Sequence, residues 1–362
     1  MRTALLAILL LFSLTSCQQS TTTDNEGNTE QAVNKNEPND KEIVCFVYHR
    51  FGDNRYPSTN ISLQDFEAHL QYLKEKDYQV LSFSEAVKYL KSEVETQKTA
   101  VITIDDGYKS FFKNCLPMLK KYGFPSTLFI NTKTVGGGDY MSWEEIKIAM
   151  GDNVEIGNHT HSHDYFLNLP ETSRYETFEE DIMLSQQLIQ ENTGFTPEVL
   201  AYPYGELDPK MKAIVQKIGF AGAAAQNSGV IYSGTDLMQC PRFPMSEAYA
   251  DINKFTSKAM MRALKIKNVS PDSFIVPKDD SKPQLSITVN SKGLQLDRLQ
   301  CFIQRAECQI NKSVSENGEA VITLSPASDI DIRRRTLYTI TVPDTTGTWR
   351  WFSHLFINPE IR

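Results

Sequence analysis

Two adjacent carboxylates stand at the end of a short apolar segment. Residues 101–104 are β-branched throughout, and they lead directly into Asp105, Asp106 and Gly107. Such a run favours a strand buried on both faces, and the glycine permits a tight turn. Because two carboxylates at one turn repel each other, a cation would stabilise them, with one binding the metal and the other left free as a base. The alternative is an ordinary Asp-Asp-Gly turn.

A histidine cluster follows about fifty residues later. Three of the six histidines, His159, His161 and His163, fall within five residues. The first and last are four apart, which can bring both imidazoles to one ion on a helical turn or compact loop. With Asp106 they would form a site of two histidines and one carboxylate, which suits zinc as a Lewis acid, with cobalt or nickel as alternatives. We expect His161 to point away from the ion. The alternative is a solvated polar loop.

Alternating strand and helix patterns would position both clusters. Strand-like segments occur at 43–48, 80–81, 101–104, 126–130, 154–157, 199–202 and 221–225, and helical patterns begin at residues 62, 84, 111, 143, 178 and 209. Repeated strand–helix units favour a parallel sheet, which can close into a barrel with its active site at the carboxyl ends of the strands. Both clusters follow such ends. We therefore predict an α/β barrel over residues 42–268.

The last part of the chain has a different pattern. Strand-like segments at 285–289, 299–303, 320–324 and 337–342 are separated by polar turns, and no long helical pattern is evident. This predicts a small all-β domain over 269–362, a sandwich by its pattern. The aromatic segment 349–352 could belong to its core or form a sugar-stacking platform. Cys301 and Cys308 could cross-link a hairpin, and Cys45 and Cys115 should be buried small hydrophobes.

The amino terminus resembles an export signal. A basic start and an apolar stretch at 4–14, too short for a stable membrane anchor, lead into Leu14-Thr15-Ser16-Cys17, which resembles a bacterial lipobox. That resemblance implies a signal peptide over 1–16 and a lipid on Cys17, anchoring an exported protein to a membrane, facing the periplasm or the cell surface. A plain secretory signal is the alternative. Residues 17–41 would be a flexible linker. The net charge of -8 argues against nucleic acid as a partner.

Three segments, in order, resemble a known family. Residues 103–107, 159–163 and 201–205 are similar to the first three motifs of the polysaccharide deacetylases (carbohydrate esterase family 4, the NodB homology domain), and the helix beginning at Trp143 also fits. The resemblance covers roughly residues 42–245. It implies a distorted (β/α) barrel and metal-dependent removal of acetyl groups from a glycan.

The resemblance also implies roles for individual residues. Asp105 would be the general base, and the backbone N–H of Tyr204 would help to stabilise the oxyanion. The metal ligands would be Asp106, His159 and His163. The remaining residues expected on the oxyanion and substrate side are Pro203, Arg242 and Trp143.

The sequence departs from the family pattern in two places. Where the third motif usually begins with an arginine that braces the catalytic aspartate, this chain has Ala201. Arg242 could supply that charge from a later strand end, or it could be a surface arginine. The late histidine that usually acts as general acid is missing, because the only histidine after residue 163 is His354, in the predicted β domain. His49 is then the best remaining acid or substrate contact, unless it is only structural.

Three functions follow from these observations. The segment at Tyr48 and His49 and the variant at 201–205 resemble the branch that includes exported poly-N-acetylglucosamine deacetylases, so N-deacetylation of an N-acetylglucosamine-containing glycan is the main hypothesis. An O-acetyl esterase acting on xylan is the second. A catalytically silent glycan-binding lipoprotein is the third, suggested by the two departures, although a pure binder would not need Asp105. In each case the partner is an acetylated polysaccharide or oligosaccharide.

Overall fold

The structure is a computed structural model that describes residues 40–277, 280–330 and 333–361. The predicted signal peptide, Cys17 and nearly all of the predicted linker lie outside the described residues. Within the described ranges, no helix has both the length and the apolar character needed to cross a membrane.

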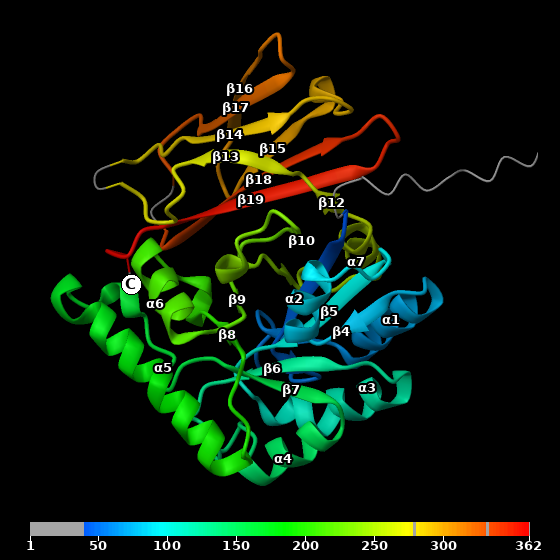
Figure 1. The fold of residues 1–362 in the computed structure, drawn as a ribbon, viewed down its shortest axis with the longest axis vertical. Coiled ribbons are helices and arrows are strands. Elements are labelled where there is room, and N and C mark those ends of the chain that lie inside the picture. Colours follow the sequence, from blue (N-terminus) through cyan, green and yellow to red (C-terminus); the bar gives the residue numbers. More distant parts are fainter. Residues whose placement is uncertain (1–39, 278–279, 331–332, 362) are drawn as a thin grey trace, which may run out of the picture. The chain divides into compact units, whose positions relative to one another are not determined.

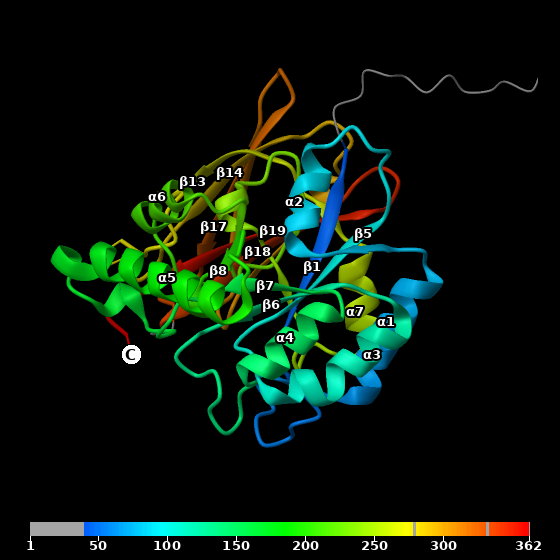
Figure 2. The ribbon, with the colours of Figure 1, turned by 60° about the horizontal axis from the view of Figure 1, so that its bottom comes forward.

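A curled, mostly parallel sheet forms the first region. Its strands follow the order β10-β1-β5-β6-β7-β8-β9, with β4 beside β5 and β11 beside β1, and only β10 runs antiparallel. Figure 2 shows β1 and β5 side by side within it. The strands are β1 (Glu42–Tyr48), β4 (Gln79–Leu81), β5 (Thr99–Ile104), β6 (Ser126–Ile130), β7 (Val154–Asn158), β8 (Val199–Ala201), β9 (Gly222–Ala224), β10 (Val230–Tyr232) and β11 (Phe243–Pro244). Strands β1, β5 and β6 are buried at every residue, which explains why their sequences are almost continuously apolar. This curled half-barrel confirms the predicted α/β fold.

Helices cover the outer face of this sheet (Figure 1). They are α1 (Leu63–Glu75), α2 (Phe83–Lys91), α3 (Leu116–Tyr122), α4 (Trp143–Gly151), α5 (Glu171–Thr193), α6 (Pro209–Ile218) and α7 (Ile252–Ala259). Ser62 caps α1 as predicted, by accepting a hydrogen bond from the backbone N–H of Asp65. Helix α5 begins seven residues before the predicted start at 178, because its first two turns are mostly exposed and carry no apolar periodicity. A π-helical turn, Phe111–Cys115, precedes α3. A short strand pair, β2 (Arg50–Phe51) and β3 (Asn60–Ile61), completes this region.

The second region is a β-sandwich, which confirms the predicted all-β part. Two four-stranded sheets have the orders β12-β19-β18-β15 and β13-β14-β17-β16. The strands are β12 (Arg262–Ala263), β13 (Ile266–Ser270), β14 (Leu285–Asn290), β15 (Gln300–Ile303), β16 (Cys308–Val314), β17 (Glu319–Pro326), β18 (Arg335–Pro343) and β19 (Trp349–Ile357). Alternate residues of both sheets fill one apolar core. Strand β16 was not predicted, because it is largely exposed and polar. The predicted boundary at 268 falls inside β13.

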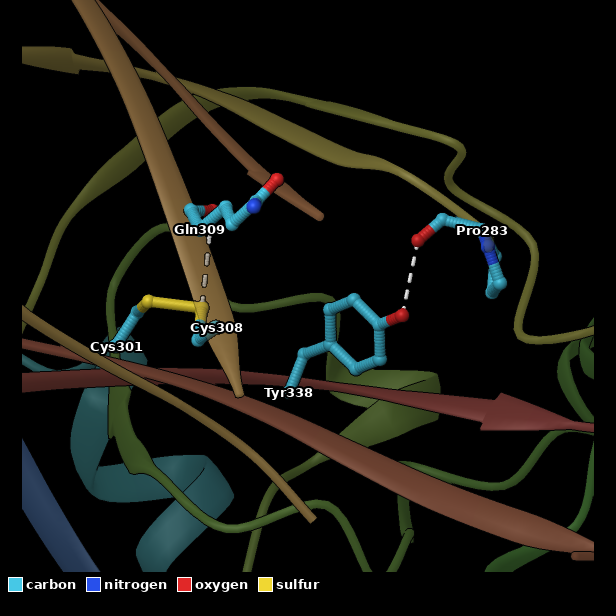
Figure 3. The surroundings of a disulfide bond; sticks show 5 residues. All are labelled: Pro283, Cys301, Cys308, Gln309 and Tyr338. Carbon is cyan, nitrogen blue, oxygen red and sulfur yellow. Dashed lines mark hydrogen bonds between the residues drawn. A yellow bond between two sulfur atoms is a disulfide. The ribbon is translucent and has the colours of Figure 1, made fainter. Parts of the chain in front are cut away.

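A disulfide links the two sheets of the sandwich (Figure 3). Cys301 lies on β15 and Cys308 on β16, and their Cα atoms are 6.0 Å apart. The predicted cross-link is confirmed: Ile303 and Ala306 form an antiparallel bridge, so the two cysteines face each other across a short hairpin turn. The arms of this turn continue into different sheets, because β15 pairs with β18 and β16 pairs with β17. The bond therefore joins opposite layers across the turn that contains Gln304 and Arg305. The cysteines Cys45, Cys115 and Cys240 are free and buried.

The aromatic segment of β19 packs against the barrel. The ring of Trp351 meets Phe243 edge-on at 5.5 Å, and its Nε1 donates to the carbonyl oxygen of Ser228 at 3.1 Å. The side-chain nitrogen of Lys258 lies 3.7 Å above the same indole. Trp351 is thus a packing residue between the two regions, whereas its neighbour Phe352 packs against the sandwich core, which is one of the two roles predicted for this segment.

Candidate metal and catalytic site

Asp105 and Asp106 occupy the carboxyl end of β5. The backbone N–H of Asp105 donates to the carbonyl oxygen of Tyr48 at 2.9 Å, which extends the pairing of β1 and β5 by one residue. Asp106 and Gly107 then both adopt positive φ angles of 74°. A Cβ at Gly107 would lie 3.1 Å from a methyl group of Ile130, so both its conformation and its surroundings favour glycine. The sharp turn separates the two neighbouring carboxylates, which point to different partners.

The three predicted metal ligands meet at one point. Oδ1 of Asp106 lies 3.5 Å from Nε2 of His159 and 3.3 Å from Nε2 of His163, and the two Nε2 atoms are 3.2 Å apart. Four-coordinate zinc with bonds of about 2.0–2.2 Å to nitrogen and oxygen would hold its ligand atoms roughly 3.3 Å apart. The separations and the donor types therefore fit a divalent cation.

Hydrogen bonds orient the rings of His159 and His161. The Nδ1–H of His159 donates to the carbonyl oxygen of Ala201 at 2.7 Å, which leaves Nε2 facing Asp106 and His163. Nδ1 of His161 lies 2.8 Å from the hydroxyl of Thr132, so this imidazole is held apart from the other two. The arrangement agrees with the expectation that His161 is no ligand.

Asp181 anchors the histidine loop from helix α5. Its Oδ1 accepts the backbone N–H groups of His161 at 2.6 Å and of Ser162 at 3.0 Å. Asn158, at the end of β7, accepts the N–H of Thr160 at 2.7 Å. Nothing in the sequence marks Asp181, because it stands among several glutamates on a long polar helix. Only the packing of α5 beside β7 reveals it.

Charge and burial set the protonation of the ligands. Burial alone would raise the pKa of Asp106, but hydrogen bonding to His159 and the charges of nearby histidines lower it well below its usual range. Burial, followed by the charge of His159, lowers the pKa of His163 to about 4. For His159, burial is outweighed by Asp106 and Asp105, which raise its pKa. At neutral pH, Asp106 and His163 are thus in their ligating forms, and a bound cation would oppose protonation of His159.

Arg242 braces Asp105. Its Nη1 and Nη2 donate to the two carboxylate oxygens at 2.7 and 2.8 Å, and its Nε donates to the carbonyl oxygen of Ala225 at 2.9 Å. Both side chains have no exposed surface. Burial would raise the pKa of Asp105, but the charges of Arg242 and His159 outweigh it, and the pKa is lowered. The surface-arginine alternative is wrong. The substrate-side placement of Arg242 is also corrected, because its buried guanidinium is committed to Asp105.

The two other histidines considered as acids lie in different surroundings. Nε2 of His49 is 4.0 Å from Oδ2 of Asp105, and 21% of its side chain is exposed, so it borders the site from the end of β1. His354 is buried in the sandwich, between the rings of Phe274 and Phe356 at 4.9 and 4.7 Å. His49 therefore remains the candidate acid, and His354 is a packing residue.

Tyr204 closes the site from the loop after β8. It adopts φ 59° between the buried residues Pro203 and Gly205. Its ring lies 4.6 Å from that of His163 and stacks on Tyr165 at 3.8 Å. Trp143, at the start of α4, packs against the apolar core of the barrel, so its predicted contact with substrate stays a prediction.

Unusual backbone conformations concentrate around these residues. Seven non-glycine residues in the described ranges have positive φ, and four of them belong to this site: Asp106, Thr160, His163 and Tyr204. Such conformations cost of order 1 kcal/mol or more each and persist only where the surroundings enforce them. Their clustering marks the carboxyl edge of the sheet as the functional centre of the barrel.

The barrel region is similar to proteins that have been described before. Residues 92–223 match the family model described as polysaccharide deacetylase. YxkH of Bacillus subtilis is 26% identical over 197 residues, which are 52% of this chain and 68% of YxkH. The poly-beta-1,6-N-acetyl-D-glucosamine N-deacetylase of Staphylococcus aureus is 24% identical over 213 residues, which are 56% of this chain and 73% of that protein.

Solved structures share the fold of the barrel. The structure of IcaB from Ammonifex degensii aligns with a TM-score of 0.53 and 27% identity, covering 59% of this chain and 96% of IcaB. The Streptococcus pyogenes deacetylase PplD, solved in complex with acetate, aligns with a TM-score of 0.55 and 18% identity, covering 60% of this chain and 98% of PplD. At that identity, the second likeness establishes the fold alone.

Proposed function

We propose that the chain, residues 92–223 of which match the polysaccharide deacetylase family model, is a hydrolytic deacetylase that removes N-acetyl groups from an N-acetylglucosamine-containing glycan in a metal-dependent reaction. One observation carries the proposal: a three-ligand cluster, Asp106 with His159 and His163, lies beside a second carboxylate, Asp105, that is held ionised and apart by Arg242. The named activity of the Staphylococcus aureus relative supports N-deacetylation.

Each residue has a distinct part in the proposed reaction. Asp105 accepts a proton from the attacking water, whose oxygen bonds to the acetyl carbon. The backbone N–H of Tyr204 donates a hydrogen bond to the developing oxyanion. The C–N bond then breaks, and His49 delivers a proton to the leaving amine, so that acetate and a free amino sugar result. A divalent cation held by Asp106, His159 and His163 supplies Lewis acidity to the acetyl carbonyl, and we propose zinc, with cobalt or nickel as alternatives.

Arg242 bears on the choice between an enzyme and a silent binding protein. The missing arginine at position 201 motivated the binding hypothesis, and Arg242 reaches the same carboxylate from the segment just before β11. A guanidinium that keeps a buried carboxylate ionised is what a general base requires and what a binding protein does not. This contact favours the enzyme. We further propose that the enzyme is an exported lipoprotein, anchored to a membrane through Cys17.

The test is acetate release by the purified full chain. Protein stripped with a chelator and reloaded with zinc, cobalt or nickel would be assayed on β-linked N-acetylglucosamine oligomers and on acetyl-xylan. We expect metal-dependent release from the oligomers, with one free amine formed for each acetate. Release from acetyl-xylan alone would replace the proposal with an O-acetyl esterase.

Three variants test the assignment of residues. Asp105→Asn should keep its metal and lose about 10²- to 10⁴-fold in kcat, the usual contribution of a positioned base. Asp106→Asn should lose metal and activity together. His161→Gln is the matched control, because that ring is held by Thr132 outside the ligand cluster, and its metal content should equal that of the wild type. Full metal content and activity in Asp106→Asn would disprove the ligand set.

A further inference from the structure

A cavity of about 550 Å³ lies beside the proposed metal ligands, and residues of both the barrel and the sandwich line it. Tyr204 lines it, and the ring of Tyr204 lies 4.6 Å from that of the proposed ligand His163. The volume falls within the range of about 300–1,000 Å³ that is typical of small-molecule sites. The cavity therefore begins one residue away from the proposed reaction centre.

The barrel wall of this cavity consists of loops on the catalytic side of the sheet. Ser58 lies in the loop after β2, Tyr204 follows β8, Gln226 follows β9, and Tyr249 follows β11. Each is carried by a segment that leaves the carboxyl end of a strand, the end at which Asp105 and Asp106 stand. In barrels of parallel strands that end is where substrates bind. The cavity thus lies at the carboxyl end of the sheet, beside the proposed reaction centre.

The sandwich supplies the opposite wall and fastens it to the loop that contains Tyr204. Arg334 donates from Nε and Nη2 to both carboxylate oxygens of Glu206, at 2.6 Å each, and Arg335 donates from Nη1 to the carbonyl oxygen of Tyr204 at 3.1 Å. The Arg334 and Glu206 side chains are only 10% and 4% exposed. A largely buried bidentate pair is geometrically specific, so the wall is built into the fold. Arg335, 35% exposed, lines the cavity.

The exposed groups in the cavity have the chemistry of sugar recognition. Tyr249 is 50% exposed and offers an aromatic face, and the amides of Gln226 and Gln304 can both donate and accept hydrogen bonds. The guanidinium of Arg335 adds donors for hydroxyl and acetamido oxygens. Arg333, Arg334 and Arg335 all line the cavity, while the one carboxylate of Glu206 pairs with Arg334 at 2.6 Å and lies 3.8 Å from Arg335, so this wall carries an excess of hydrogen-bond donors. Gln304 lies in the turn between Cys301 and Cys308, so the disulfide restrains one of these groups.

We propose that this cavity is a subsite that binds a sugar residue of the polysaccharide next to the residue that is deacetylated, with the β-sandwich forming one of its walls. The proposal rests on the glycan deacetylase function and assigns the sandwich a part in substrate binding. The enzyme should therefore prefer long oligomers to short ones, because only a longer chain fills both the reaction centre and this subsite.

The experiment compares a double variant, Tyr249→Ala with Gln304→Ala, against Phe302→Ala in the full chain. Phe302 is a matched control, since it lies on β15 two residues before Gln304, is 54% exposed and does not line the cavity. KM and kcat would be measured for β-linked N-acetylglucosamine oligomers of two to six units. Each lost contact is worth about 1 kcal/mol, or roughly five-fold. We expect KM for the hexamer to rise about 5- to 30-fold in the double variant, with a much smaller change for the dimer.

A binding measurement separates this proposal from the proposed reaction. Calorimetry of the hexamer with Asp105→Asn, alone and combined with the double variant, reports affinity without turnover. Weaker hexamer binding in the combined variant would support the subsite even if no oligomer were deacetylated, and the reaction assignment alone would then fail. Turnover by the wild type, with equal KM and equal hexamer affinity in the presence and absence of the double change, would overturn the subsite. Equal losses on dimer and hexamer would also overturn it, since they indicate a structural effect.

Discussion

The barrel and the sandwich treat buried polar groups in opposite ways. In the barrel, Asp105 and Arg242 have no exposed surface, and four non-glycine residues with positive φ belong to the candidate metal site or lie beside it. In the sandwich, the core is apolar, and the disulfide between Cys301 and Cys308 holds its layers together. Among its described residues only Arg305 is a non-glycine residue with positive φ.

This contrast separates functional from structural use of burial. Ionised side chains and strained backbone reduce stability unless the surroundings compensate, so their presence in the barrel indicates that the site is maintained for chemistry. The sandwich carries few such costs and can act as a rigid support. The sandwich reaches the proposed site where Arg335 donates to the carbonyl oxygen of Tyr204.

The largest effect should follow removal of the charge that pairs with Asp105. Arg242→Ala leaves a buried carboxylate without its partner, which costs about 3–5 kcal/mol of stability. Chemical denaturation would measure this loss, and activity should fall with it. Arg55→Ala is the control, because Arg55 is 62% exposed in its ion pair with Asp53 and its removal should cost far less stability. Similar losses in both variants would contradict the bracing role.

Acid should destabilise both regions, and apart from the proposed ligand His163 each region has one histidine whose pKa is lowered to about 4. Burial lowers the pKa of His69 in the barrel and of His354 in the sandwich to about 4, against about 6.5 in an unfolded chain. Between these values the unfolded chain binds more protons, so stability falls as the pH is lowered from about 6.5 to about 4. At roughly 1.4 kcal/mol per pKa unit, each histidine contributes about 3 kcal/mol to the fall.

Replacing these histidines distinguishes the two regions. In the described residues Nε2 of His354 has no hydrogen-bond partner and its ring makes one hydrogen bond to the backbone of Ser273, whereas His69 contacts the hydroxyl of Tyr48 and the carbonyl of Ala250. His354→Phe should therefore reduce the pH dependence at a smaller cost at pH 7. His69→Phe should reduce it too, but at a cost of about 1–3 kcal/mol for the polar groups left unpaired. Unchanged acid sensitivity in both variants would refute this account.

Loss of the disulfide should affect the sandwich selectively. Cys301→Ser with Cys308→Ser opens a short loop and should cost about 2 kcal/mol, because the unfolded chain gains freedom. Thermal unfolding would measure the loss. The metal content should equal that of the wild type, since the proposed ligands Asp106, His159 and His163 all lie in the barrel. A parallel loss of metal would show that the two regions are coupled more tightly than their contacts indicate.

The smallest effect should come from the residue that supports the histidine loop. Asp181→Ala leaves the N–H groups of His161 and Ser162 without their acceptor, so the loop should loosen and metal affinity should fall about 10- to 100-fold. Competition with a chelator would measure it. Glu180→Ala, an exposed neighbour on α5, should have no effect on affinity. Equal affinity in both variants would remove Asp181 from the supporting shell.

Local sequence determined the elements and the types of reacting groups. The apolar run before Asp105, the cap at Ser62 and the alternation in β14, β17 and β18 specify their structures through short-range patterns. The spacing of His159 and His163 predicted two ligands, and Asp106 was correctly placed with them in space. Polar or exposed elements were not predicted, as the strand at Cys308 and the early start of α5 show, because they lack an apolar period.

Only the tertiary structure decided which distant groups meet. Arg242 and Asp105 are 137 residues apart, and Arg334 and Glu206 are 128 apart, so no local pattern can pair them. The same holds for Asp181 beneath the histidine loop and for the assignment of Cys301 and Cys308 to strands of two different sheets. Propensity and periodicity act over a few residues, whereas these contacts depend on how the barrel curls and how the sandwich packs on it. The sequence thus determined the chemistry available to this protein, and the packing decided its geometry.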